Sequence, residues 1–140
     1  MLKFVISGEE IKSRALNVGL TILRVFAGMS IVFGHGLGKI PVSDRFIEGV
    51  VNLGLPFPVF FAWSAGISEF FGGLLLALGL FTRPSAFFLT LTMATAAFLR
   101  HADDPFSGKE KALLYMVIFI LFLFMGSGKY GIDQSLRKRN

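Results

Sequence analysis

The stretch VFFAWSAGISEFFGGLLLALGLF, from Val59 to Phe81, decides the fold class of this chain. It is almost entirely apolar and long enough to cross a bilayer as a helix, which takes about 20 apolar residues. One acidic residue, Glu69, lies near its centre. Because a carboxylate is costly in an apolar helix, Glu69 needs a partner, and it is a candidate functional residue.

The composition of the whole chain agrees with an integral membrane protein. Of the 140 residues, 54% are hydrophobic and 16% are charged, against roughly 25% charged in a typical soluble domain. A soluble domain of this size could not bury so much apolar surface. The net charge of +5 does not indicate nucleic acid, because there is no basic stripe interleaved with aromatic residues. The absence of cysteine excludes disulfides and thiolate metal sites formed by this chain.

Four apolar runs are predicted to cross the membrane and to pack as a four-helix bundle. The runs are Leu16–Leu37, Val59–Phe81, Pro84–Leu99 and Ala112–Gly126. Because only residues 82 and 83 separate the second and third runs, these two must form an antiparallel hairpin. We therefore expect one all-α domain over residues 1–140, with a cytoplasmic N-terminal segment at 1–15 and a basic C-terminal tail at 134–140.

The segment between the first two runs and the distribution of basic residues bear on topology. Val42–Leu55 has apolar residues near helical spacing, which predicts a short helix at the membrane interface; a disordered loop is the alternative. With an even number of membrane helices, more lysines and arginines fall on the side of the two termini than on the opposite side. This bias predicts that both termini are cytoplasmic.

Small residues surround Glu69 on its helical face, so another helix should pack closely there. These residues are Ala65, Gly66, Gly72 and Gly73. The expected partner of Glu69 is Arg24, since Arg24 lies about 12 Å and Glu69 about 18 Å from the cytoplasmic side at 1.5 Å per residue. Two interpretations stay open: an ion pair that only fixes the helix register, or a site that titrates protons or anchors a ligand.

A second polar group is predicted at the outer membrane surface, where the ends of three helices meet. It consists of His35, Lys39, His101 and Glu110. A hydrogen-bonded rim of interfacial residues is the simplest interpretation. Proton relay or quinone chemistry is the second, and metal binding by two histidines and a carboxylate is the third.

Several segments, in their order and spacing, resemble the DoxX family of small bacterial membrane proteins. They are LRVFAGMSIVFGHGLGKI, GLPFP, SEFFGGLLLALGLFTRPSA, a later histidine, GKEKALLY and GSGKYGID. The resemblance covers about Leu20 to Asp133 and implies a four-helix bundle in the bacterial inner membrane. It falls on Arg24, His35, Gly36, Lys39, Glu69, Gly73, Arg83, His101, Glu110, Gly128 and Asp133.

The resemblance also implies a function, because the family takes its name from a subunit of a thiosulfate:quinone oxidoreductase. We expect a membrane-embedded, redox-associated subunit that acts with quinone or with a partner oxidoreductase. The candidate catalytic residues are Glu69, Arg24 and His35, and the candidate cofactor-binding residues are His35, Lys39, His101 and Glu110. A non-catalytic scaffold for a partner protein is the alternative, and a small transporter ranks last. A homo-oligomer is left open by the sequence.

Overall fold

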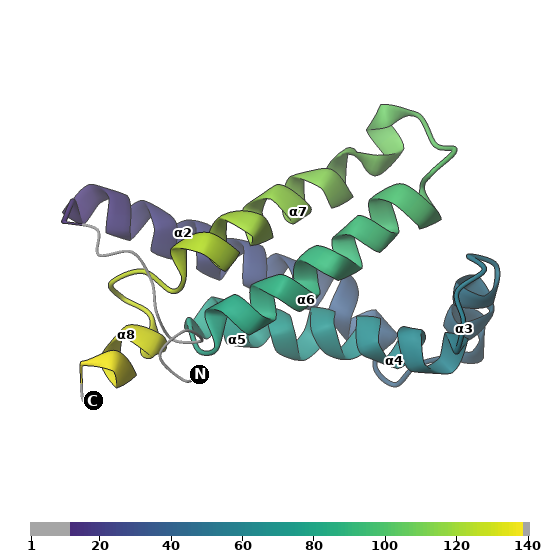
Figure 1. The fold of residues 1–140 in the computed structure, drawn as a ribbon, viewed down its shortest axis with the longest axis horizontal. Coiled ribbons are helices and arrows are strands. Elements are labelled where there is room, and N and C mark those ends of the chain that lie inside the picture. The colour runs from purple at the N-terminus through teal and green to yellow at the C-terminus, as the bar shows by residue number, and fades with distance from the viewer. Residues whose placement is uncertain (1–11, 139–140) are drawn as a thin grey trace.

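The computed structural model describes residues 12–138, and this part of the chain consists of helices joined by turns and loops, without strands (Figure 1). The elements are α2 (Arg14–Ile31), η1 (Val32–Gly36), η2 (Leu37–Lys39), α3 (Asp44–Val51), α4 (Pro58–Ile67), η3 (Ser68–Gly72), α5 (Gly73–Leu78), α6 (Thr82–Thr95), η4 (Ala96–Arg100), α7 (Phe106–Met125) and α8 (Ile132–Arg137). The predicted all-α class is confirmed. Most of the predicted N-terminal segment and the last two residues of the predicted tail lie outside the described residues.

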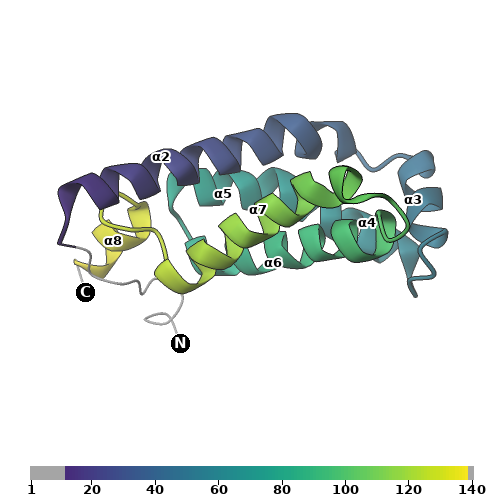
Figure 2. The same ribbon diagram turned by 90° about the horizontal axis from the view of Figure 1, so that it is seen from above.

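Each predicted apolar run corresponds to one long helical rod. The rods are α2 with η1 and η2, then α4 with η3 and α5, then α6 with η4, and finally α7. Three rods contain a π-helical turn, η1, η3 or η4. The largest difference from prediction is that α7 begins at Phe106 rather than Ala112, because the polar residues before the apolar run are helical too. Figures 1 and 2 show α6 and α7 side by side.

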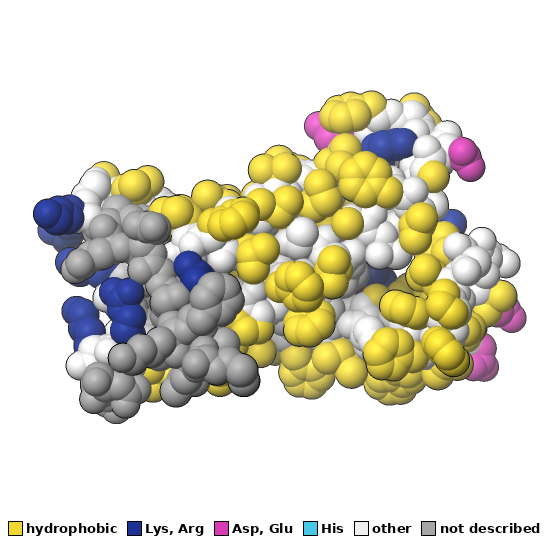
Figure 3. Space-filling view, viewed as in Figure 1, with side chains coloured by type: hydrophobic (Ala, Val, Ile, Leu, Met, Phe, Trp, Pro, Cys, Tyr) yellow, Lys and Arg dark blue, Asp and Glu magenta, His cyan; other side chains and the backbone are white. Residues whose placement is uncertain are grey.

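Two of the rods are long and apolar enough to cross a membrane, Arg14–Lys39 and Pro58–Leu78. Only 33% of the most apolar window of each is buried within the protein, whereas the core helix of a soluble protein would be mostly buried. Phe26, Phe60 and Phe124 are each about two-thirds exposed, and hydrophobic side chains cover the middle of the face in Figure 3. These outward-facing side chains suit a lipid environment.

The rods enclose a shared apolar core. Ile31 of α2, Leu76 of α5, Leu89 of α6 and Phe119 of α7 are all 0% exposed and belong to one cluster. Each rod therefore contributes at least one fully buried side chain. The core holds the rods in place around the site described below.

Two glycines set the register between α2 and α5. A Cβ added to Gly28 would lie 2.6 Å from the carbonyl oxygen of Gly73. A Cβ added to Gly73 would lie 2.7 Å from Cγ2 of Val32. Such close backbone contact is typical of small residues between membrane helices, and it places Gly28 level with Gly73.

The segment between the first two rods forms a helix, as predicted, rather than a disordered loop. α3 covers Asp44–Val51, less than the predicted Val42–Leu55. Ser43 caps its N-terminus by accepting a hydrogen bond from the backbone N–H of Phe46 at 3.3 Å. In Figures 1 and 2, α3 lies at the end of the molecule opposite α8 and packs against α4.

Candidate functional site

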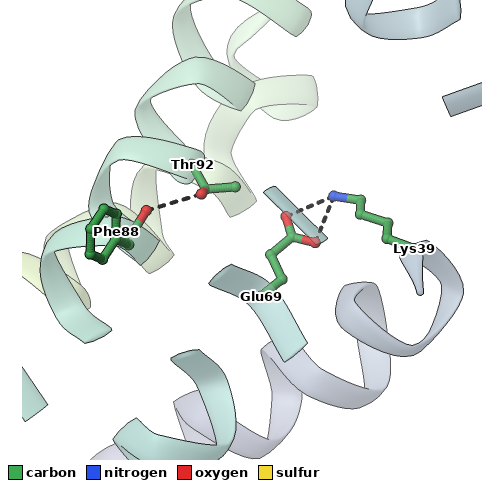
Figure 4. A network of polar contacts seen from close by, with 4 residues as sticks. All are labelled: Lys39, Glu69, Phe88 and Thr92. Atoms are coloured by element: carbon green, nitrogen blue, oxygen red, sulfur yellow. Dashed lines mark hydrogen bonds and ion pairs between the residues drawn. The ribbon is translucent and has the colours of Figure 1, made fainter. Parts of the chain in front are cut away.

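Glu69 forms an ion pair with Lys39. The ammonium of Lys39 donates to Oε1 of Glu69 at 2.7 Å and lies 2.6 Å from Oε2; Figure 4 shows the two side chains pointing at each other. The Glu69 side chain is 1% exposed and the Lys39 side chain 26% exposed. The carboxylate is therefore part of the interior, and the ammonium reaches it from the edge of the protein.

Glycines and π-helical turns bring this pair together. η1 and η3 contact each other, and a Cβ added to Gly36 would lie 2.8 Å from Cα of Phe70. A Cβ added to Gly66 would lie 3.1 Å from the carbonyl oxygen of Lys39. The first rod can thus pass directly against the second where Glu69 faces it. π-helical turns shift the direction of the side chains that follow and occur frequently at functional sites.

The predicted pairing of Glu69 with Arg24 is wrong. Arg24 is 2% exposed, and its Nη1 donates to the carbonyl oxygens of Leu76 and Ala77, both at 2.9 Å. A Cβ added to Gly79 would collide with the Arg24 guanidinium, so Arg24 lies level with Gly79. Roughly ten residues at 1.5 Å each put that level about 15 Å from Glu69. The predicted depths require the start of α2 and the end of α5 to lie at the same level. In the structure α2 extends about ten residues past the end of α5, so that Arg24, and not Arg14, lies level with Gly79.

Asp133 anchors the C-terminal helix α8 near Arg24. Its carboxylate is buried and accepts hydrogen bonds from the backbone N–H groups of Phe81 at 2.8 Å and Thr82 at 2.9 Å. These are the first free N–H groups of α6, so Asp133 caps that helix from a distant part of the chain. Its own N–H donates to the carbonyl oxygen of Gly79 at 2.9 Å. Arg24 and Asp133 therefore both bind backbone at the end of the molecule farthest from Lys39.

A cavity of about 550 Å³ lies beside the Lys39–Glu69 pair. It lies between α3, the α4–η3 rod and the α6–η4 rod, and Figure 3 shows the face hollowed between α6 and the α3–α4 region. Most of its lining is apolar: Phe46, Val50, Leu53, Phe61, Phe88 and Leu91 are among the residues that form it. Small-molecule sites usually have volumes of roughly 300–1,000 Å³, so the cavity has the size of a ligand site.

Ser68 supplies a polar group of this cavity that has no partner among the described residues. Its side chain is 8% exposed, and its Oγ is buried without a hydrogen-bond partner among the described residues. By contrast, the hydroxyl of Thr92 donates to the carbonyl oxygen of Phe88 at 3.0 Å (Figure 4). A buried hydroxyl without a partner requires an explanation, and a ligand in the cavity would provide one. Ser68 is not among the candidate residues predicted from the sequence, although it directly precedes Glu69.

His35 lies near the pair but does not line the cavity. It is half-buried in η1, with its ring edge-on to Tyr115 at a centroid distance of 6.4 Å. It is also within electrostatic range of Glu69 and Lys39. The structure thus places two of the four residues of the predicted outer group, His35 and Lys39, close to Glu69.

The other two residues of that group lie elsewhere. His101 Nδ1 is 2.6 Å from a carboxylate oxygen of Asp104 in the turn between η4 and α7, and Glu110 is exposed on α7. Within residues 12–138, no hydrogen bond or ion pair joins either of them to His35. No three His, Cys, Asp or Glu side chains in that range are grouped as metal ligands would be.

Comparison with known sequences places the site within a recognised family. The sequence model of the DoxX family matches residues 19–102, more than half of the chain. The chain belongs to the DoxX family. Both members of the ion pair and the whole cavity lining, from Lys39 to Arg100, fall within the matched range. The site therefore lies within the part of the chain that matches the DoxX family.

Three curated relatives support the assignment. Two are named "Uncharacterized protein" and come from Haemophilus influenzae: one is 40% identical over 82 residues, covering 54% of this chain and 61% of the relative. The other is 31% identical over 130 residues, covering 87% of this chain and 85% of the relative. The third, named "Putative oxidoreductase CatD", comes from Bacillus subtilis and is 30% identical over 122 residues, covering 86% of this chain and 89% of the relative. No solved structure matches.

Proposed function

We propose that this DoxX-family membrane protein is a quinone-linked redox subunit whose ligand site is the cavity beside Glu69. The observation that carries the proposal is the buried hydroxyl of Ser68, without a partner among the described residues, next to the Lys39–Glu69 pair in a mostly apolar cavity. A quinone has carbonyl oxygens that accept hydrogen bonds and an apolar remainder, so its two parts match the two parts of the cavity. The oxidoreductase name of the Bacillus subtilis relative agrees with this class of activity.

The side chains at the polar end have distinct roles in this proposal. Ser68 donates a hydrogen bond through its hydroxyl, and Lys39 holds a positive charge where negative charge develops on the ligand. Glu69, whose buried carboxylate is held by the Lys39 ammonium, is the proton acceptor or donor in this proposal. A bound quinone would supply the electron-accepting chemistry.

Protons and electrons must also reach the site. His35, half-buried and within electrostatic range of Glu69, carries protons between the pair and the surface in this proposal. The chain has no cysteine, so no dithiol of its own passes electrons, and we propose that they come from a partner redox protein. Arg24 is not part of this site because it lies at the opposite end of the second rod.

We further propose that all four rods cross the bacterial inner membrane with both termini in the cytoplasm. In Figure 3, basic side chains gather without visible acidic ones at the end formed by the start of α2 and by α8, while the opposite end carries both acidic and basic side chains. This distribution follows the positive-inside rule. α3 then lies at the outer membrane interface, where it covers the cavity.

The test is whether quinone accompanies the protein and depends on the cavity. Protein extracted in mild detergent would be analysed by native mass spectrometry, and organic extracts would be assayed for quinone by chromatography. We expect quinone in the wild type and its loss in Ala65→Leu, because Ala65 lines the cavity and a larger side chain fills it. Ala15→Leu, at an exposed position at the start of α2, is the matched control and should keep the quinone.

Other outcomes would contradict the proposal. Equal quinone content in the wild type and in Ala65→Leu would show that the cavity is not the site. A wild type without quinone that co-purifies with a partner protein would instead support the scaffold function. In that case Glu69→Ala should lower expression without a separate loss of activity.

A further inference from the structure

Two arginines face the cavity from different elements at the end of the molecule opposite α8. Arg45 comes from α3 and Arg100 from η4, and both line the cavity. Both side chains are exposed. Within the described part of the chain, neither takes part in a hydrogen bond or an ion pair.

The charges that line the cavity do not balance. Its basic residues are Lys39, Arg45 and Arg100, and its acidic residue is Glu69. Because Glu69 is paired with Lys39, the charges of Arg45 and Arg100 are left uncompensated. We call the exposed part of the cavity at these two arginines its mouth. Acidic residues nearby do not remove this excess of positive charge. Asp44 and Glu48 on α3 are exposed and do not line the cavity. In the turn after η4, Asp103 is exposed and also outside the lining, and Asp104 pairs with His101.

The cavity also has apolar walls that extend to the outer surface of the rods. Phe60 is 65% exposed, Phe88 57% and Leu91 49%, yet all three line the cavity. An apolar chain that lies along the rods can therefore contact the cavity wall from the side. The mouth thus combines a cationic end with an apolar groove that continues to the lipid-facing surface.

We propose that this mouth binds an anionic phospholipid, with its phosphate between Arg45 and Arg100 and an acyl chain against Phe60, Phe88 and Leu91. Guanidinium groups bind phosphate through paired, charge-assisted hydrogen bonds. Basic pockets between membrane helices are known to select anionic headgroups. This inference goes beyond the proposed function, because it requires only that the rods lie in a membrane.

The test compares lipids that differ only in the headgroup. Delipidated protein in detergent would be titrated with dioleoyl phosphatidylglycerol or dioleoyl phosphatidylcholine, and bound lipid would be counted by native mass spectrometry. One basic residue near an anionic lipid contributes roughly a fivefold change in affinity. The double variant Arg45→Gln/Arg100→Gln should therefore bind phosphatidylglycerol roughly 25-fold more weakly, with little change for phosphatidylcholine.

The control variant is Lys12→Gln/Arg14→Gln, which removes the same charge from exposed positions at the opposite end. It should bind phosphatidylglycerol like the wild type. Equal affinity of the wild type for the two lipids, or an unchanged affinity in the arginine variant, would overturn the inference. Displacement of the lipid by millimolar inorganic phosphate would also overturn it, because the site would then serve a free anion. The lipid titration uses delipidated protein, from which any quinone has been removed as well, so each proposal can fail without the other.

Discussion

The ammonium of Lys39 lies within 2.7 Å of both carboxylate oxygens of Glu69, and this ion pair joins the end of the first helical rod to the π-helical turn of the second. The two partners differ in their access to water, since Glu69 is 1% exposed and Lys39 26% exposed. Without its partner, Lys39 can extend toward the surface, as long basic side chains do. The carboxylate of Glu69 has no such route.

This asymmetry predicts unequal effects of removing the two charges. Lys39→Met leaves a buried carboxylate without a partner and should lower the stability by about 3 kcal/mol. Glu69→Gln should cost less, about 1 kcal/mol, because Lys39 can reach solvent. The double variant should be more stable than Lys39→Met alone. Thermal unfolding in detergent would measure all three, and equal losses in the two single variants would contradict the asymmetry.

A double-mutant cycle should separate Arg24 from the site. Arg24→Gln and Glu69→Gln should have additive effects on stability, because side chains separated by more than about 10 Å rarely couple. Arg24→Gln and Asp133→Asn should instead show a non-additive effect on stability, since both side chains bind backbone next to Gly79, at Leu76, Ala77, Phe81 and Thr82. Additivity in the second cycle, or coupling in the first, would contradict the arrangement at the α8 end.

The helical rods could be predicted from the sequence because apolar runs of this length have few alternatives. The partner of Glu69 could not be predicted, because it depends on how far α2 is shifted along α5. That shift is set by the contact between Gly28 and Gly73, and a small residue in one helix does not indicate which residue of another helix faces it. The sequence places Lys39 in a separate outer group, because its position along its own helix does not show which residue of the neighbouring helix it faces.

The role of Asp133 illustrates a second limit. The resemblance to DoxX proteins singled out this residue, but its hydrogen bonds go to Phe81 and Thr82, about fifty residues away in the chain. Helix caps can be predicted from sequence when the capping side chain directly precedes the helix, as Ser43 does for α3. A cap supplied by a distant segment leaves no local pattern.

The close contact between α2 and α5 predicts a strong effect of one methyl group. Gly28→Ala would place a Cβ 2.6 Å from the carbonyl oxygen of Gly73, so the rods would have to separate, at a cost of about 2 kcal/mol. Gly19→Ala on the same helix has no atom within 4 Å and should be neutral or slightly stabilising. Thermal unfolding of both variants in one detergent would provide the comparison, and similar melting temperatures would contradict the predicted register.

The distant cap of α6 predicts that Asp133→Ala destabilises the protein by about 1–2 kcal/mol, because two N–H groups lose their acceptor. Hydrogen exchange should then increase at the start of α6, at Phe81 and Thr82. Asp103→Ala removes an exposed carboxylate from the turn before α7 and is the matched control. Unchanged exchange at the start of α6 in Asp133→Ala would show that the cap has no energetic role.

Ser68 predicts a separation of stability from ligand binding. Because its hydroxyl is buried without a partner among the described residues, Ser68→Ala should leave the stability of the ligand-free protein unchanged or slightly increase it. The same change should weaken quinone binding by about 1 kcal/mol, or roughly fivefold, if the hydroxyl donates to the ligand. Thr92→Val alters a hydroxyl in the same cavity that already donates to Phe88, so it should affect quinone affinity much less.

The measurements are thermal unfolding without ligand and quinone titration of delipidated protein. A loss of stability in Ser68→Ala would show that the hydroxyl has a partner within the protein, and equal quinone affinities for the wild type and Ser68→Ala would remove Ser68 from the site.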